Sequence, residues 1–292
     1  MSRESPVVGI LGTGDMGSAV ARCLIDKGIP VITCLDGRSE RSRHRAQAAG
    51  MTDTDSLDDM LQRTDILLSI IPPAAAIDFA LRVCPLLAKS GRDPLFVECN
   101  AVAPQTVAEI ANIAEDSKIR FQDVGIIGAA PQPGRAAVRF YTSGPYVAEV
   151  RQLATELVDI RTVGEEIGDA SAIKMVYASM TKATHAVRAA AAIAGEKLGV
   201  GEAIRAEWRE SLPDVYAAMK NRLPGLPGVS GRWVGEMQEI AKTYESIGLT
   251  PSFHDGAAWM YEMLSSVDPD IDAGIEQAIE RFVEALEERS PT

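Results

Sequence analysis

The most constraining feature of the sequence is an apolar run that leads into a glycine-rich turn. Residues 7–18 read Val-Val-Gly-Ile-Leu-Gly-Thr-Gly-Asp-Met-Gly-Ser, and a helical pattern follows at 19–24. In this Gly-x-Gly-x-x-Gly arrangement, Gly12 permits a tight turn, Gly14 lets the backbone approach a pyrophosphate, and Gly17 lets the helix pack on the strand. The first amides of the helix then face the phosphates. The segment predicts a dinucleotide site with five contacting residues: Gly12, Gly14, Asp15, Met16 and Gly17.

Length and charge limit the classes of partner. The chain has 292 residues, 46% of them hydrophobic, and a net charge of −12 at pH 7. This length favours two domains, and an acidic surface repels nucleic acid and anionic membranes. We therefore expect small-molecule partners, with no nucleic acid and no membrane. The sequence shows no charged-then-apolar leader and no apolar run of about 20 residues, which predicts a cytoplasmic protein.

The cysteines and histidines give no metal-binding pattern. The four cysteines are far apart in apolar or strand-like segments, which predicts reduced, buried and inert thiols: Cys23, Cys34, Cys84 and Cys99. The three histidines have no carboxylate pair with metal-ligand spacing around them: His44, His185 and His254. We therefore expect no required metal ion.

Two patterns of secondary structure divide the chain. Up to about residue 165, helical stretches alternate with short apolar strands at 7–11, 30–35, 66–71, 95–99 and 119–126. Beyond it, helical segments dominate, at 168–198, 202–222, 230–247, 253–265 and 271–289, with a loop at Pro224, Gly225, Pro227 and Gly228. The first pattern is typical of a parallel sheet covered on both faces. We predict an α/β fold, with a doubly wound, mostly parallel sheet in residues 1–166 and an all-α domain in residues 167–292.

The residues after the second expected strand bear on the choice between NAD and NADP. Asp36 is placed to accept from a ribose hydroxyl, as in NAD sites. Arg38 can fork onto a 2′-phosphate while Ser39 donates from a helix start, and Arg43 lies in the same basic run. We favour NADP over NAD, with Arg38, Ser39 and Arg43 as binding residues. A solvated helix face is the alternative for this run of charges.

Three strand ends supply further candidates, because ligands of open sheets bind at the carboxyl ends of the strands. Ile71 and Pro72 end the strand at 66–71. Asn100 follows the next strand and is a candidate for holding a carboxamide or a substrate oxygen, although such residues are also common turn formers. After the strand at 119–126, Gly128 could offer its amide to a carboxylate or oxyanion, or simply mark a bend.

The best candidate for chemistry is Lys174, early in the first long helix of the second domain. At about 100° per residue, Lys174, Tyr177 and Thr181 share one arc of this helix with His185 and Arg188. These side chains form either the solvent-facing side of an amphipathic helix or, if they are buried against a neighbouring element, a catalytic site. A desolvated lysine has a lowered pKa and can exchange a proton with an alcohol or carbonyl while hydride moves. Tyr177, one turn on, could bind the same substrate.

Taken together, these segments resemble the β-hydroxyacid dehydrogenases, a family that includes 3-hydroxyisobutyrate dehydrogenase and 6-phosphogluconate dehydrogenase. Residues 12–17 resemble its glycine fingerprint, Ile71-Pro72 its nicotinamide-side strand end, Asn100 its fifth-strand Asn, and 168–174 its helical Gly-to-Lys segment. The resemblance implies a Rossmann-like N-terminal domain, a nicotinamide cofactor, a lysine that donates and accepts the proton, and a helical domain that forms a homodimer.

Some segments are similar to a branch of the family with a distinct phosphogluconate-dehydrogenase-like C-terminal domain: 37–39, 123–128, 174–177 and 232–237. Three positions depart from the family pattern. Ile127-Gly128-Ala129 replaces the usual Ser-Gly-Gly, Tyr177-Ala178 replaces Asn-Asn or His-Asn, and Gly235-Glu236 stands near the usual Lys-Asp pair. These departures argue against an ordinary small β-hydroxyacid as the substrate. Glu236 could reach a cationic or less acidic ligand.

From these residues we predict an NAD(P)-dependent oxidoreductase that interconverts an alcohol and its carbonyl. Lys174 is the expected acid/base and Tyr177 its catalytic neighbour. Two alternatives remain, an imine reductase and a cofactor-binding sensor without turnover. The expected substrate-binding residues are Asn100, Gly128, Thr181 and Glu236.

Overall fold

The computed structural model describes residues 5–289. It divides into two compact units, Met1–Met175 and Val176–Thr292. The division falls inside helix α7 (Asp169–Ala178), whereas the boundary expected from the sequence, between residues 166 and 167, precedes that helix. The first turns of α7 thus belong with the sheet.

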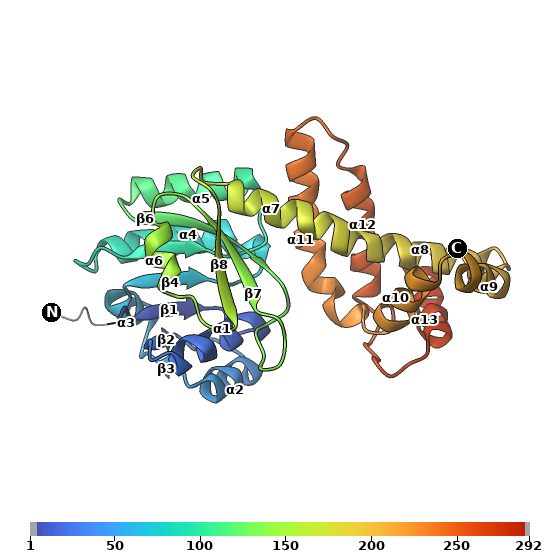
Figure 1. Cartoon of the computed structure of the whole chain (residues 1–292), viewed down its shortest axis with the longest axis horizontal. Coiled ribbons are helices and arrows are strands. Elements are labelled where there is room, and N and C mark those ends of the chain that lie inside the picture. The colour runs from blue at the N-terminus through green and yellow to red at the C-terminus, as the bar shows by residue number, and fades with distance from the viewer. Residues whose placement is uncertain (1–4, 290–292) are drawn as a thin grey trace. The chain divides into compact units, whose positions relative to one another are not determined.

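The first unit contains one eight-stranded sheet in the order β3-β2-β1-β4-β5-β6-β7-β8 (Figure 1). All neighbouring strands are parallel except β6 and β7, which are antiparallel. This confirms the α/β class and the mostly parallel sheet. The strands are β1 (Val8–Leu11), β2 (Val31–Thr33), β3 (Thr52–Asp53), β4 (Ile66–Ser69), β5 (Leu95–Glu98), β6 (Arg120–Ile127), β7 (Val138–Ser143) and β8 (Val158–Gly164).

Helices cover both faces of this sheet, each over its own hydrophobic core. One core joins strand residues to α1, α2 and α6, and the other joins them to α3, α4 and α5. The helices are α1 (Asp15–Asp26), α2 (Glu40–Ala49), α3 (Leu57–Arg63), α4 (Ala76–Ala88), which follows a 3₁₀ turn at Pro73–Ala75, α5 (Pro104–Asp116) and α6 (Val147–Arg151). Three of the four free cysteines are buried as expected, but Cys23 is half-buried.

The sequence analysis missed β3, β7 and β8. β3 has only two residues, and both are exposed. β8 lies at the edge of the sheet, and its Asp159 and Arg161 break the apolar pattern that reveals a buried strand. The five expected strands are all present, each within two residues of its expected end.

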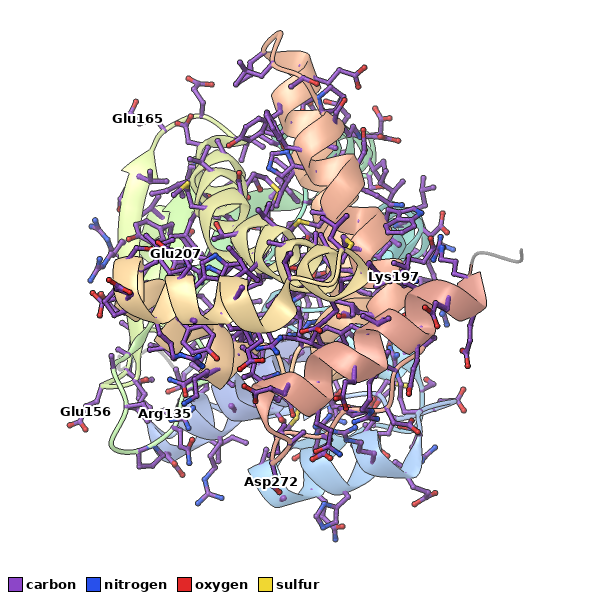
Figure 2. All side chains as sticks on the ribbon, turned by 90° about the vertical axis from the view of Figure 1, so that its right-hand side faces the viewer. Arg135, Glu156, Glu165, Lys197, Glu207 and Asp272 are labelled. Carbon is purple, nitrogen blue, oxygen red and sulfur yellow. The ribbon has the colours of Figure 1, made fainter. Side chains whose placement is uncertain are left out.

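The second unit is helical and has a core of aromatic and methionine side chains, among them Trp233, Met237, Tyr261 and Phe282. Charged side chains cover the outside of both units, for example Glu207 and Lys197 on the helical unit (Figure 2). The elements of the helical unit are a π-helical turn, η2 (Ser179–Ala183), and the α-helices α8 (Thr184–Lys197), α9 (Gly201–Ser211), α10 (Pro213–Arg222), α11 (Pro227–Ser246), α12 (Ser252–Leu264) and α13 (Ile275–Arg289).

Four expected helices differ from the observed ones, and the last of them begins at Ile275 rather than at residue 271. The segment 202–222 is two helices because Pro213 starts a new one, as its fixed φ and missing N–H favour at a first turn. Pro227 and Gly228, expected in a loop, form the first turn of α11. The π turn interrupts the expected helix over 168–198, so the 100° spacing used to place Thr181 and His185 does not hold across Ser179–Ala183.

Gly125 of β6 explains how closely α7 approaches the sheet. A Cβ at Gly125 would overlap the carbonyl oxygen of Ala170 and lie 3.0 Å from Cβ of Lys174. Neither atom belongs to the far end of a flexible side chain, so the helix would have to shift. Gly125 therefore fixes the distance between α7 and the strand that ends beside it.

We predict that Gly125→Ala lowers the free energy of unfolding by about 1–3 kcal/mol, the usual cost of overpacking. Gly235→Ala in α11 is the matched control, since its Cβ would meet nothing within 4 Å. That control should leave stability unchanged or raise it by about 0.5–1 kcal/mol. Denaturant melts of both variants test this, and equal stability of the two would contradict it.

Candidate active site

The glycine turn between β1 and α1 is built for a cofactor backbone. Gly12 has φ +104°, and a Cβ there would overlap the carbonyl oxygen of Ile70. A Cβ on Gly17 would overlap the carbonyl oxygen of Gly12, so both residues must be glycine for packing. A Cβ on Gly14 would meet nothing within 4 Å. Gly14 thus leaves open the space that the dinucleotide fingerprint reserves for pyrophosphate.

Two further features of the turn fit a polar ligand. Thr13 is 5% exposed, and its buried Oγ1 has no hydrogen-bond partner. Gly14, the N-cap of α1, provides no side-chain cap, which leaves the first amides of the helix to a ligand. Of the other expected contacts, Asp15 is exposed and pairs with Arg45 of α2, and Met16 packs against the core. The residues present therefore fit a dinucleotide.

The basic run after β2 forms an ordered start to α2. Ser39 caps this helix, and its Oγ accepts from the Ser42 amide at 3.3 Å. Arg43 is half-buried, and its Nε donates to the carbonyl oxygen of Arg38 at 3.2 Å. The side chains of Arg38 and Asp36 are exposed. The cap and the Arg43 contact hold the Arg38 backbone beside the helix start.

Asn100 connects the ends of β4 and β5. Its Oδ1 accepts from the amide of Ile71 at 2.6 Å, and its Nδ2 donates to Ser69 Oγ at 2.9 Å. Asn100 is 4% exposed. Its oxygen and one amide hydrogen are thus used inside the unit, where they fix the turn that begins with Ile71 and the exposed Pro72. Asn100 acts here as a positioning residue for that turn.

A carboxyl group that the sequence analysis did not select lies beneath Asn100. Glu98 is 1% exposed, and its Oε1 accepts a hydrogen bond from the backbone amide of Asn100 at 2.8 Å. Its Oε2 is buried with no partner. Burial, aided by the charge of nearby Asp123, raises the pKa of Glu98 to about 8. Glu98 is therefore mostly protonated at neutral pH.

Asp123, opposite Glu98 on β6, anchors helix α7. Its Oδ2 accepts from the amides of Gly168 and Ser171, both at 3.0 Å, and from Ser143 Oγ at 3.3 Å, while its Oδ1 accepts from Ser171 Oγ at 2.8 Å. Burial raises its pKa, and these hydrogen bonds oppose that rise. Sequence reasoning missed its role, although a carboxylate inside an apolar strand is a usable signal.

Lys174 lies one turn after this anchor. Its Nζ donates to the carbonyl oxygen of Ile126 at 2.6 Å, and the side chain is half-buried. Ile126 is near the carboxyl end of β6, the same edge of the sheet at which the glycine turn, Ile71 and Asn100 lie. The first unit thus brings the lysine amine to the edge where open sheets bind ligands. Gly128, with φ +130°, follows β6 at this edge.

The remaining expected residues belong to the helical unit. Tyr177 is 43% exposed, and Thr181 is exposed with its hydroxyl donating to the Tyr177 carbonyl at 3.0 Å. Glu236 is 5% exposed and forms ion pairs with Lys182 and Arg232. Its carboxylate is therefore already neutralised by side chains of its own unit.

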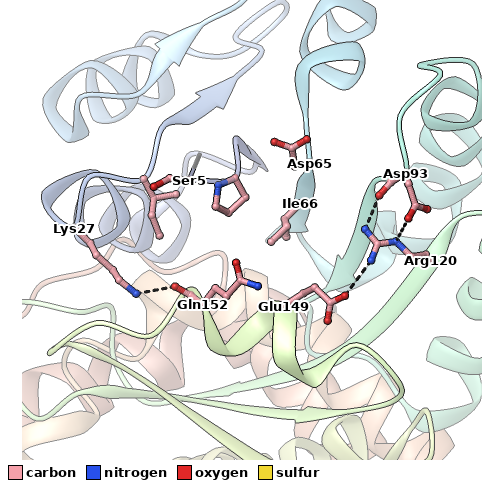
Figure 3. A pocket seen from close by; sticks show the side chains of 10 residues that line it. Ser5, Lys27, Asp65, Ile66, Asp93, Arg120, Glu149 and Gln152 are labelled. Carbon is pink, nitrogen blue, oxygen red and sulfur yellow. Dashed lines mark hydrogen bonds and ion pairs between the residues drawn. The ribbon is translucent and has the colours of Figure 1, made fainter. Parts of the chain in front are cut away.

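A cavity of about 620 Å³ lies elsewhere in the first unit, at the amino ends of the parallel strands (Figure 3). Its charges are satisfied internally. Arg120 pairs with Asp93 and Glu149, and Lys27 donates to the Gln152 carbonyl at 2.7 Å. Because dinucleotides bind at the opposite edge of such sheets, this cavity is not the cofactor site.

Among residues 5–289, no three His, Cys, Asp or Glu side chains come together to hold a metal ion. No helix within the same range has both the length and the apolar character needed to cross a membrane.

Because the pKa of Glu98 is raised, we expect the free energy of unfolding to depend on pH. Between about pH 4.5 and 8 the folded protein keeps a proton that the unfolded chain loses, so this group lowers the free energy of unfolding as pH rises. Glu98→Gln is isosteric with the protonated acid and does not titrate. Its free energy of unfolding should therefore exceed that of the wild type by a margin that grows by up to about 1.4 kcal/mol for each pH unit. Denaturant melts at pH 5–8 measure this, with exposed Glu207→Gln as control. A pH-independent difference would refute it.

Comparison with known proteins agrees with this geometry. Residues 7–158, more than half of the chain, match the NAD binding domain of 6-phosphogluconate dehydrogenase, and residues 196–264 match a domain of unknown function, DUF1932. An uncharacterized 28.5 kDa protein from the 7S RNA 5′ region of Methanothermus fervidus is 26% identical over 245 residues, 84% of this chain and 93% of that protein.

Two solved structures share the fold over almost their full length. The 3-hydroxyisobutyrate dehydrogenase of Mycobacterium tuberculosis with L-serine has a TM-score of 0.69 and 16% identity, covering 95% of this chain and 99% of that one. An imine reductase from Myxococcus stipitatus in complex with NADP+ has a TM-score of 0.55 and 17% identity, covering 95% and 100%. The expected family is confirmed: the chain belongs to the β-hydroxyacid dehydrogenase family, with an NAD-binding domain followed by a helical C-terminal domain.

Proposed function

We propose that this protein is an NAD(P)-dependent oxidoreductase that interconverts a hydroxyacid-like alcohol and its carbonyl, with Lys174 as general acid and base. The observation that carries the proposal is the hydrogen bond of 2.6 Å from Lys174 Nζ to the Ile126 carbonyl. It holds the amine at the ligand-binding edge of a sheet that also carries the dinucleotide fingerprint. Family membership supports hydride chemistry at that edge.

A nicotinamide cofactor held by the glycine turn would supply the hydride acceptor for oxidation of the alcohol carbon. Lys174 accepts the hydroxyl proton on a neutral amine, and the Ile126 carbonyl accepts a hydrogen bond from the resulting ammonium. The reverse direction returns the proton to the carbonyl oxygen. We propose Gly128 as an amide donor to substrate, and Tyr177 and Thr181 as side chains that contact it. Asn100 and Asp123 act as positioning residues, through Ile71 and α7.

Lys174→Met should lower turnover by about 10²–10⁴-fold, the usual contribution of general acid–base catalysis. Cofactor affinity should stay within about twofold, because Lys174 lies outside the glycine turn. Nicotinamide absorbance is followed with hydroxyacids, aldehydes and imines, using both cofactors. Lys197→Met is the control, since Lys197 is exposed and pairs with Glu287. Full turnover by Lys174→Met would refute the assignment.

The same panel separates the two alternatives. Reduction of imines alone is the second candidate function, favoured by Tyr177-Ala178 in place of the family's amide side chains. In that reaction Lys174 or Tyr177 would protonate the nitrogen. Tight cofactor binding with no turnover on any class would identify a sensor.

We propose NADP as the favoured cofactor and NAD as the alternative. The support is Arg38, placed beside the α2 cap through the Arg43 contact, in a chain that is otherwise acidic. Arg38→Ala should raise the Kd for NADP+ by about tenfold or more and leave that for NAD+ unchanged. Calorimetric titration measures both. Arg22→Gln, which removes an exposed arginine paired with Asp26, is the control. An equal loss of affinity for both cofactors would contradict a contact between Arg38 and the 2′-phosphate.

A homodimer formed by the helical unit and a cytoplasmic location also belong to this proposal. Three large apolar side chains, one each on α7, η2 and α8, are exposed: Val176, Met180 and Val187. Exposed apolar side chains grouped in this way are typical of an interaction surface. The free buried thiols are typical of proteins in a reducing compartment.

A further inference from the structure

Four cationic and aromatic side chains surround Trp233 inside the helical unit. The Arg222 guanidinium carbon is 4.8 Å from the Trp233 ring centroid, and Lys182 Nζ is 5.1 Å from it. The His185 ring stacks on the same indole at 6.2 Å, and Tyr261 meets it edge-on at 5.3 Å. These residues come from α10, η2, α8 and α12, with Trp233 on α11. We call Trp233, Arg222, His185 and Lys182 the tryptophan cluster.

Polar atoms of this cluster lack partners. Trp233 is 5% exposed, and its Nε1 is buried without a hydrogen bond. Arg222 Nε and His185 Nδ1 are also buried without one. Within residues 5–289, no carboxylate forms an ion pair with Arg222. A buried donor without a partner costs about 1–3 kcal/mol, so the fold keeps these groups at a cost to stability.

The cluster also holds more positive than negative charge. Besides burial, the charge of Arg232 acts to lower the pKa of both Lys182 and Arg222, and Glu236 is the carboxylate that faces them. Burial is the main cause of the lowered pKa of both Lys182 and Arg222. Burial also lowers the pKa of His185 to about 4, followed by the charges of Arg222 and Arg188. In a chain of net charge −12, this local excess is unusual.

We propose that the tryptophan cluster binds an oxyanion of a small ligand, a carboxylate or a phosphate. Arg222 supplies the planar fork of donors that suits such groups, and the indole N–H of Trp233 supplies a further donor. Glu236 keeps Lys182 in place beside the ring. Arg222 and His185 are half-buried, so a ligand reaches them from solvent. The inference goes beyond the proposed function and does not depend on Lys174.

Binding is tested with inorganic phosphate and with acetate, each against chloride at equal ionic strength. Tryptophan fluorescence should show a saturable change with at least one of the two probes, which also distinguishes the two sources of oxyanion. Arg222→Gln should weaken that binding by about tenfold or more, and Arg222→Lys by less. Arg209→Gln is the matched control, because Arg209 is exposed and lies over Tyr216 at 5.7 Å. Trp233→Phe keeps an aromatic ring but removes the indole N–H, so it should weaken binding as measured by calorimetry.

A second measurement uses the unaltered protein, in case Arg222→Gln folds poorly. A bound oxyanion offsets the charges of Arg222 and Arg188, so the pKa of His185 should rise when the probe that binds is added. NMR titration measures this, with the resonance assigned by its loss in His185→Gln. No saturable binding of either probe, unchanged binding in folded Arg222→Gln, or an unshifted His185 would overturn the proposal. Lys174→Met should bind the probe normally, so failure of the proposed function is distinguishable.

Discussion

The contact between Asp123 and the first turn of α7 fixes the geometry of the candidate site. Four donors from Gly168, Ser171 and Ser143 converge on this carboxylate, and Lys174 follows one helical turn later. Gly125 allows the helix to approach β6 so closely that the lysine amine reaches a backbone carbonyl of the same strand. A strand residue, a helix start and a missing Cβ together determine where the Lys174 amine lies.

The neighbouring strand end is held by a different kind of interaction. Asn100 fixes the Ile71 amide and receives support from Glu98, whose burial favours its protonated form. A second carboxylate this close to Asp123 would add repulsion in a low dielectric, so one protonated and one hydrogen-bonded acid is the arrangement with the lower free energy. The polar groups at this edge are therefore ordered before any ligand arrives, which limits the reorganisation that binding requires.

The sequence predicted what depends on local pattern. The glycine turn could be predicted because backbone contacts require glycine at positions 12 and 17. These contacts are made within the turn itself or with the adjacent strand end. Asp123, Glu98 and Arg222 were not identified, because their roles come from partners far along the chain. Asp123 meets Ser171, which is 48 residues away. The π turn at Ser179–Ala183 was also missed, since hydrogen bonds of its side chains to His254, Glu236 and the rest of the helical unit hold a geometry that no local propensity indicates.

The departures from the family pattern and the tryptophan cluster both bear on the charge of a ligand. Ile127-Gly128-Ala129 lacks the hydroxyl that the family uses after the sixth strand, so an acidic substrate would lose a contact there. Within the helical unit itself, Arg222 and the Trp233 indole offer unpaired donors to an anion, and Glu236 is held by Lys182 and Arg232. A cationic ligand would meet excess positive charge in this cluster, whereas an anionic one would relieve it. At the proposed oxyanion site, the electrostatics therefore favour an anionic ligand over a cationic one, which argues against the cationic ligand expected at Glu236.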